Sequence, residues 1–87
     1  MKSRTTARFR AAFAELPTHV QDRARKVYRR FRENPKHPSL RFKRVHPDDP
    51  IYSVRISLDY RALGIMERDE IVWFWIGSHQ DYDRLLR

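Results

Sequence analysis

The sequence contains no cysteine and only two glycines among its 87 residues. Without cysteine it forms no disulfide and no thiolate metal site, which is compatible with a reducing compartment. Its longest apolar run, Ile71–Ile76, is far shorter than the roughly 20 residues that a membrane helix needs. Residues 1–6 are polar and basic, unlike the apolar segment of a signal peptide. We therefore expect a cytoplasmic protein with no membrane span. The four histidines lack the spacing of metal ligands, so we expect no metal ion and no cofactor.

Acidic residues are scarce in the first half of the chain. Residues 1–47 hold 14 lysines and arginines against 3 acidic residues, whereas residues 48–87 hold 5 against 8. This imbalance favours a polyanionic partner, either nucleic acid or an acidic protein segment. The alternative is a basic surface that only keeps the protein in solution. With 40% hydrophobic residues, a chain of this length is expected to build one core, so residues 1–87 form a single domain.

The first third of the chain has the periodicity of two helices. Phe9, Phe13 and Leu16 repeat at helical spacing up to a proline. Thr18 is the expected N-cap of a second helix, which ends before the proline at residue 35. Residues 1–6 form either a short edge strand or a frayed end. The apolar stripe of the second helix consists of Val20, Ala24, Val27, Tyr28 and Phe31.

The remainder of the chain has the pattern of β-strands. Strands are expected over 40–45, 51–58, 60–66 and 71–76. The last of these is apolar on both parities, so it should be central in the sheet, and Gly77 is expected to break it. Ser78 followed by Asp81 resembles a capping box that opens a short helix over 81–86. In the strand over 51–58, the side chains expected on the apolar face are those of Tyr52, Val54, Ile56 and Leu58.

The order of these elements predicts an α+β fold. A helical hairpin packs on one face of a twisted antiparallel sheet of three to four strands, and a short C-terminal helix follows. Only two full helices are available to cover the sheet, so the other face should stay partly open as a groove. Guanidinium groups bind phosphates and aromatic rings stack on unpaired bases, so such a face suits RNA. By strand parity it carries Arg55, Arg61, Trp73, Trp75 and, at its rim, His79.

These residue types match what RNA cleavage by a 2′-hydroxyl requires. The reaction needs a base, a cation that stabilises the phosphorane, and an acid for the leaving oxygen. His79 can be base or acid and Arg61 supplies the positive charge, while Asp81 and Tyr82 lie within a helical turn of His79. We therefore take these four as candidate catalytic residues. The candidate RNA- or phosphate-binding residues are Arg41, Lys43, Arg44, Arg55 and Trp75.

Each candidate also has a purely structural interpretation. Trp73 and Trp75 could belong to the core, because aromatic residues dominate the cores of small domains. Asp81 could be a helix cap and Arg55 an ordinary exposed strand residue. His79 alone could be a surface residue at a helix start.

Three segments taken together resemble the RelE/ParE superfamily of toxins from type II toxin–antitoxin systems. They are residues 34–45, 52–61 and 76–82, in which a Tyr-Arg strand start is followed by a strand ending in Ile-Gly-Ser-His. The resemblance covers most of the chain from about residue 9 onward. It implies a helical hairpin packed on an antiparallel sheet. Ribonuclease members of this superfamily cut messenger RNA in the ribosomal decoding site without a metal ion.

The resemblance also implies roles for individual residues. Arg61 matches the phosphate-stabilising arginine of the family, and Arg55 matches a basic position on the preceding strand. His79 stands where some members carry a catalytic histidine, and Tyr82 lies near the place of a C-terminal aromatic residue. One departure is Ser53, which stands where RelE has a lysine.

Three functions remain open from the sequence. The first is a toxin that acts as a metal-independent, ribosome-dependent messenger RNA endonuclease, inhibits translation and is neutralised by a cognate antitoxin. The second is a ParE-like toxin that inhibits DNA gyrase by binding. The third is an RNA-binding domain without toxicity. The ribosome and messenger RNA, or gyrase, are the corresponding partners.

Overall fold

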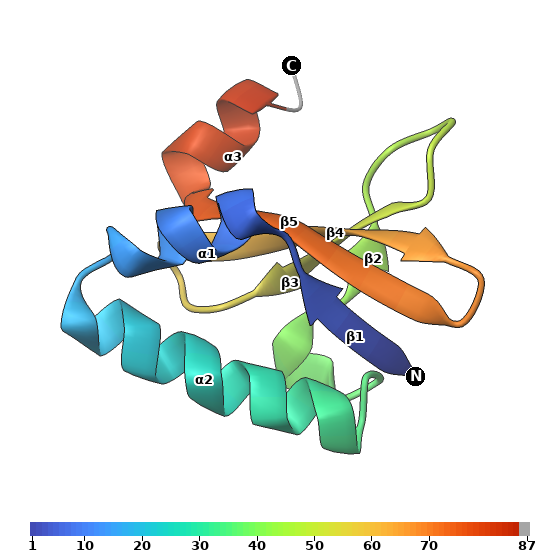
Figure 1. Ribbon diagram of the computed structural model, residues 1–87, viewed down its shortest axis with the longest axis horizontal. Coiled ribbons are helices and arrows are strands. Elements are labelled where there is room, and N and C mark those ends of the chain that lie inside the picture. Colours follow the sequence, from blue (N-terminus) through green and yellow to red (C-terminus); the bar gives the residue numbers. More distant parts are fainter. Residues whose placement is uncertain (86–87) are drawn as a thin grey trace.

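Figure 1 shows the computed structural model, which describes residues 1–85. A five-stranded sheet carries a helical hairpin on one face, and a third helix continues from the last strand. No helix in the described part of the chain is long and apolar enough to cross a membrane. The elements in chain order are β1 (Lys2–Thr5), α1 (Ala7–Ala14), α2 (Thr18–Glu33), the short 3-10 helix η1 (Pro38–Leu40), β2 (Lys43–Arg44), β3 (Ile51–Arg55), β4 (Tyr60–Glu67), β5 (Glu70–Ser78) and α3 (His79–Leu85).

The sheet has the strand order β1-β5-β4-β3-β2. Strands β2 to β5 pair antiparallel in sequence order, whereas β1 pairs parallel with β5. The predicted α+β class is thus confirmed. Strand β5 is an interior strand between β1 and β4, although the middle strand of the five is β4. The expected three to four strands are wrong by at least one. The extra strand is β1. It lies in the N-terminal segment, for which the sequence allowed either a short edge strand or a frayed end. It is parallel because the helical hairpin forms part of the crossover that returns the chain to β5.

Helix α1 begins at Thr6, whose hydroxyl accepts a hydrogen bond of 3.1 Å from the N–H of Phe9. Helix α2 begins differently from the prediction, because Thr18 is its first helical residue and Pro17 takes the cap position without a side-chain hydrogen bond. Proline is tolerated at this position because it lacks an N–H group, and the first N–H groups of a helix have no intrahelical partner. The buried stripe of α2 consists of Val20, Ala24, Val27 and Phe31.

The core lies between α2 and the sheet and is centred on aromatic side chains. The ring of Phe31 meets those of Phe42 and Trp73 edge to face, with centroids 5.1 and 5.3 Å away. Phe42 in turn stacks on Tyr52 at 4.9 Å. Contacts of this kind contribute about 0.5–1.5 kcal/mol each beyond burial of area. They fasten the hairpin to β3 and β5 and leave the opposite face of the sheet without a second helical layer (Figure 1).

A β-bulge in β5 overturns the expected parity of the two tryptophans. Leu63 pairs with Trp75 while its neighbour Gly64 pairs with Trp73, so Phe74 has no partner in the register. One extra residue turns every following side chain to the other face. Trp73 therefore packs in the core under the helices, only 4% exposed, and Trp75 lies half-buried on the opposite face. The prediction that both rings share one face is wrong.

Several predicted boundaries also change. Strand β3 ends at Arg55, so Leu58 sits in a bend and is 77% exposed instead of facing the core. Gly77 does not break β5, which continues to Ser78. The N–H of Asp81 donates to Oγ of Ser78 over 3.1 Å, as the capping pattern predicts, but α3 begins earlier than residue 81. The predicted helical residue 86 lies outside the described residues.

Candidate functional site

The candidate site lies where β4 begins and β5 passes into α3. Arg55 of β3 is the direct register partner of Arg61 of β4, and Arg61 is in turn the partner of Gly77 of β5. Their neighbours Val54 and Ala62 belong to the core under the helical hairpin. Because side chains alternate along a strand, both arginines project from the opposite face of the sheet. The sequence predicted this shared face correctly.

Three side chains make contact there and form what we call the Arg61–His79–Tyr82 cluster. Nε of Arg61 donates a hydrogen bond of 3.2 Å to Nδ1 of His79. The guanidinium carbon of Arg61 lies 5.4 Å from the centre of the Tyr82 ring, within cation–π range. The rings of His79 and Tyr82 are parallel to within 16° and 5.8 Å apart. Three residues along a helix is the spacing that brings side chains onto one face, which is why α3 can present both rings to Arg61.

The hydrogen bond from Arg61 fixes the roles of the two ring nitrogens of His79. A guanidinium group only donates, so Nδ1 must be the unprotonated nitrogen that accepts. The proton of the neutral ring then sits on Nε2, which lies 3.6 Å from a carboxylate oxygen of Asp83. The backbone N–H of His79 donates to the carbonyl of Asp59 over 2.6 Å and anchors the start of α3 beside the turn before β4.

Asp83 was missed by the sequence reasoning, which selected Asp81. The carboxylate of Asp81 instead faces Arg84 at 3.7 Å, and its backbone N–H is bound to Ser78. The structure does not bring Asp81 into the cluster. The signal that could have found Asp83 was the four-residue spacing from His79, which aligns two side chains along a helix.

The two arginines of the site have no acidic partner within residues 1–85. Nη1 of Arg61 is buried and has no hydrogen-bond partner among residues 1–85. In the same part of the chain neither Arg55 nor Arg61 forms an ion pair with an acidic residue. Like charges directly opposite each other on neighbouring strands are destabilising, and a buried N–H without a partner costs about 1–3 kcal/mol. An anion bound between the two guanidinium groups would relieve both costs.

Trp75 borders this cluster through Gly77. A Cβ atom on Gly77 would lie only 2.6 Å from Cζ2 of Trp75, so the indole lies directly over the glycine. Gly77 is the cross-strand partner of Arg61. The half-buried ring is therefore next to the cationic centre, at a location from which it can contact a base. Its assignment as an RNA-binding residue stays a prediction.

The remaining basic candidates lie in three different places. Lys43 of β2 is the register partner of Ser53 and so shares its face of the sheet, beside Arg55. Arg44 is occupied elsewhere, because it donates to the carbonyls of His46 and Asp48 and holds the loop before β3. Arg41 lies outside the cluster, in a pocket that includes Arg55. Among residues 1–85, no three histidine, aspartate or glutamate side chains converge where a metal ion could bind.

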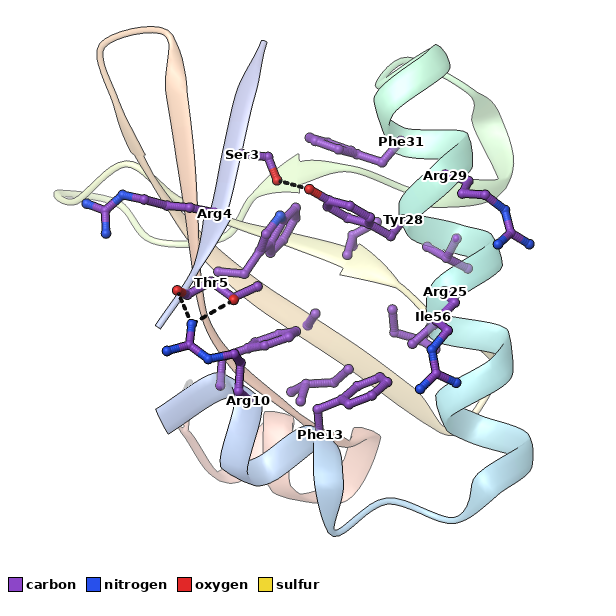
Figure 2. A pocket seen from close by; sticks show the side chains of 17 residues that line it. Ser3, Arg4, Thr5, Arg10, Phe13, Arg25, Tyr28, Arg29, Phe31 and Ile56 are labelled. Carbon is purple, nitrogen blue, oxygen red and sulfur yellow. Dashed lines mark hydrogen bonds between the residues drawn. The ribbon is translucent and has the colours of Figure 1, made fainter. Parts of the chain in front are cut away.

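A second feature, which the sequence reasoning did not predict, is an apolar cleft between β1, α1 and α2 (Figure 2). It has a volume of about 700 Å³ and is crossed by a hydrogen bond of 2.9 Å between Ser3 and Tyr28. The indole N–H of Trp73, which lines the cleft, is buried without a partner in the described residues. The lining includes four arginines and no acidic residue: Arg4, Arg10, Arg25 and Arg29. Phe9 and Phe13 of α1 line the cleft and are only partly buried.

Comparisons with known proteins identify a family and similar folds. The model of a family described as the ParE-like toxin domain matches residues 18–84. Among solved structures, a chain of the RelB–RelE antitoxin–toxin complex from Methanococcus jannaschii is 13% identical, with a TM-score of 0.76 over 95% of this chain and 98% of that one. The YoeB/ParE toxin from Agrobacterium tumefaciens is 13% identical, with a TM-score of 0.71 over 91% and 99%. YafQ from Escherichia coli is 6% identical, with a TM-score of 0.74 over 93% and 96%. No curated protein sequence matches the chain.

Proposed function

The chain belongs to the ParE-like toxin domain family, and on that basis we propose that it is the toxin of a type II toxin–antitoxin system that cleaves messenger RNA on the ribosome. The observation that carries the proposal is the contact between Arg61 and His79. It joins a potential proton acceptor to a cation with a free, buried N–H, and a second cation, Arg55, lies directly opposite. These are the groups that cleavage by a 2′-hydroxyl requires without a metal ion. The similar folds include that of RelE, to whose branch the sequence resemblance attributes ribonuclease activity.

In the proposed reaction, the scissile phosphate binds between Arg55 and Arg61. Once the guanidinium of Arg61 turns its donors to the phosphate, Nδ1 of His79 is free to take the proton of the 2′-hydroxyl. The 2′-oxygen then bonds to phosphorus, and the two arginines stabilise the extra negative charge of the phosphorane. Asp83, beside Nε2, stabilises the imidazolium that forms. Nδ1 of His79 is thus assigned as the general base.

The bond from phosphorus to the 5′-oxygen breaks next, and that oxygen needs a proton. Tyr82 is the candidate donor within the cluster, because its ring lies against both Arg61 and His79. The products are a 2′,3′-cyclic phosphate and a free 5′-hydroxyl. The half-buried Trp75 would hold a neighbouring base by stacking.

We assign the apolar cleft to the antitoxin partner. Its occupant is an acidic amphipathic segment of the antitoxin, because the lining combines partly buried aromatic rings with Arg10 and Arg29, which form no ion pair within residues 1–85. The other two arginines of the lining are paired within the chain, Arg4 with Glu70 and Arg25 with Asp22. A polar group of that segment would accept the hydrogen bond that Trp73 now lacks. Charge complementarity of this kind raises the rate and specificity of association.

The proposal is tested with purified ribosomes translating a defined message. The wild-type protein should cut the message, leaving 5′-hydroxyl ends, and His79→Ala should fold normally and leave the message intact. A second arm expresses the protein in cells with and without the product of a neighbouring antitoxin gene and maps the 5′ ends of cellular messages. Growth arrest with intact messages would contradict ribonuclease activity.

The matching family model is named for ParE, which supports inhibition of DNA gyrase as a second candidate. An inhibitor that acts by binding does not need His79 as a base. This alternative predicts loss of supercoiling activity in vitro when the protein is added to gyrase. It also predicts toxicity that persists in His79→Ala, so one variant separates the two functions.

A further inference from the structure

A second basic cavity adjoins the Arg61–His79–Tyr82 cluster, and we call it the arginine pocket. It has a volume of about 520 Å³ and lies between α2, η1 and the bend that follows β3. Four arginine residues are among those that line it, and none of the described lining residues is acidic. They come from four separate sequence positions, namely Arg23, Arg30, Arg41 and Arg55.

Two of these arginines are held by neutral groups. Nε of Arg23 donates to the carbonyl of Ile56 over 3.2 Å, and Nη1 of Arg30 donates to Oγ of Ser39 over 3.0 Å. Each guanidinium has five N–H donors, so these single bonds orient the groups and leave most of their donors available. Within residues 1–85 none of the four pocket arginines is paired with an acidic residue. The pocket is therefore ordered and positively charged at the same time.

The backbone of Arg41 has an unusual conformation, which is a separate observation about the pocket. Its backbone has φ 46° and ψ 43°, the left-handed region that residues with a Cβ adopt only at a cost. The position follows η1, where glycine or asparagine is usual. Such outliers cluster at ligand-binding and active sites. Arginine at this position therefore has conformational strain, and it forms no ion pair within residues 1–85.

Arg55 connects the pocket with the cluster. It lines the arginine pocket, and it is also the direct cross-strand partner of Arg61. Partners in an antiparallel pair are roughly 4.5–5.5 Å apart at Cα. Arg55 is therefore the residue that the pocket and the strand pair of the cluster have in common.

We propose that the arginine pocket is a second phosphate subsite, which holds a backbone phosphate of single-stranded RNA next to the one bound between Arg55 and Arg61. The inference rests on the proposed ribonuclease function. Planar guanidinium forks match phosphate oxygens, and an RNA strand that is bound at the cluster carries a further phosphate on each neighbouring nucleotide. The exposed Leu58 at the rim gives a ribose or base an apolar surface to rest on. The pocket fixes the register of the strand, so that one particular 2′-hydroxyl reaches His79.

The test compares two double variants that remove the same charge. Arg23→Gln with Arg30→Gln removes two pocket donors, whereas Arg8→Gln with Arg32→Gln removes two exposed arginines that line neither cavity. The probe is a single-stranded RNA oligonucleotide carrying 2′-O-methyl groups, which binds but cannot be cleaved. We expect the pocket variant to weaken Kd by about tenfold or more. Its slope of log Kd against log salt should fall by about 0.7 for each phosphate that the protein no longer neutralises. The control should change Kd only about twofold by comparison.

A third variant separates a loss of RNA affinity from a loss of folding. Arg41→Gly removes a pocket guanidinium and also relieves the left-handed backbone, so its melting temperature should not fall while its RNA affinity does. RNA affinities of the pocket variants equal to that of the control would overturn the subsite. Loss of binding only to a poly-glutamate peptide, with RNA affinity unchanged, would assign the pocket to an acidic protein segment and also overturn it.

Failure of the subsite is distinguishable from failure of the proposed function. If the wild-type protein cuts ribosome-bound message but the pocket variants bind RNA like the control, only the subsite is wrong. If the wild-type protein cuts nothing while the pocket variants lose RNA affinity, the subsite stands as a binding site and the nuclease assignment is wrong.

Discussion

Nε of Arg61 donates to Nδ1 of His79 over 3.2 Å, although the two residues are 18 positions apart and lie on different elements. The contact exists because β4 and β5 pair so that Tyr60 faces Ser78, which puts the first residue of α3 beside the start of β4. It ties a cation to a base through one hydrogen bond. Binding of a phosphate to Arg61 would therefore release the nitrogen that the reaction needs.

The first prediction concerns the carboxylate that supports His79. His79→Ala should lower the cleavage rate by about 10²–10⁴-fold, the usual range for a general base. Asp83→Asn should give a smaller loss, because it removes only the group that faces Nε2. Asp81→Asn is the matched control and should retain activity, since Asp81 faces Arg84 outside the cluster. Equal losses for the two aspartate variants would contradict the geometry assigned to Asp83. The measurement is the single-turnover rate on ribosome-bound message.

The second prediction concerns the opposed pair Arg55 and Arg61. Arg55→Gln removes a like-charge contact between neighbouring strands and should raise the stability of the free protein by about 0.2–1 kcal/mol. The gain should shrink in high salt, because salt screens the repulsion. Cleavage should fall at the same time, since one of the two phosphate ligands is gone. Chemical denaturation at two salt concentrations, with the cleavage assay alongside, checks both effects. A loss of stability at low salt would show that the two charges do not repel.

The sequence could predict that one site brings together Arg55, Arg61 and His79. Their proximity depends only on strand order and on the alternation of side chains. Short links force consecutive strands to pair antiparallel, and His79 directly follows the last strand. The bulge at Phe74 could not be predicted in that way. The bulge results from cross-strand packing, since Gly64 leaves room for the side chains of Ile71 and Trp73. The local sequence pattern of β5 does not predict such a bulge.

The pairing of the edge strand β1 could not be predicted from the sequence either. Its residues are polar and basic, and their partner in the sheet is Glu70–Trp73, far along the chain. A parallel pairing at that separation is decided by the return of the whole crossover, not by the strand's own residues. The apolar cleft depends on β1 for one wall, which is why the sequence predicted a groove only on the other face of the sheet.

The third prediction contrasts the two glycines. A Cβ on Gly64 would meet Ile71 and Trp73 at 2.8 Å, so Gly64→Ala should destabilise the core by about 1–3 kcal/mol. A Cβ on Gly77 would meet only the ring of Trp75, at 2.6 Å. Gly77→Ala should therefore displace the half-buried indole, with a smaller cost in stability and a larger loss of RNA affinity. Thermal unfolding and RNA titration distinguish the two, and a Gly77→Ala protein with unchanged RNA affinity would show that Trp75 does not contact the ligand.

The fourth prediction concerns Ser53, which is completely buried and whose hydroxyl has no partner among residues 1–85. A buried hydroxyl without a hydrogen bond costs about 1–3 kcal/mol, so Ser53→Ala should stabilise the protein by about 1 kcal/mol. For a domain of this size that corresponds to a rise in melting temperature of about 4–8 °C.

Ser57→Ala is the matched control for that substitution. The hydroxyl of Ser57 accepts a hydrogen bond of 3.3 Å from the N–H of Asp59, so its removal should lower the melting temperature. A small side chain at Ser53 also leaves space beside Lys43, its partner on β2. Because alanine preserves that space, Ser53→Ala should leave RNA affinity unchanged. A fall in melting temperature for Ser53→Ala would mean that the hydroxyl is bound by an ordered water, and the buried serine would then be part of a hydrogen-bonded network.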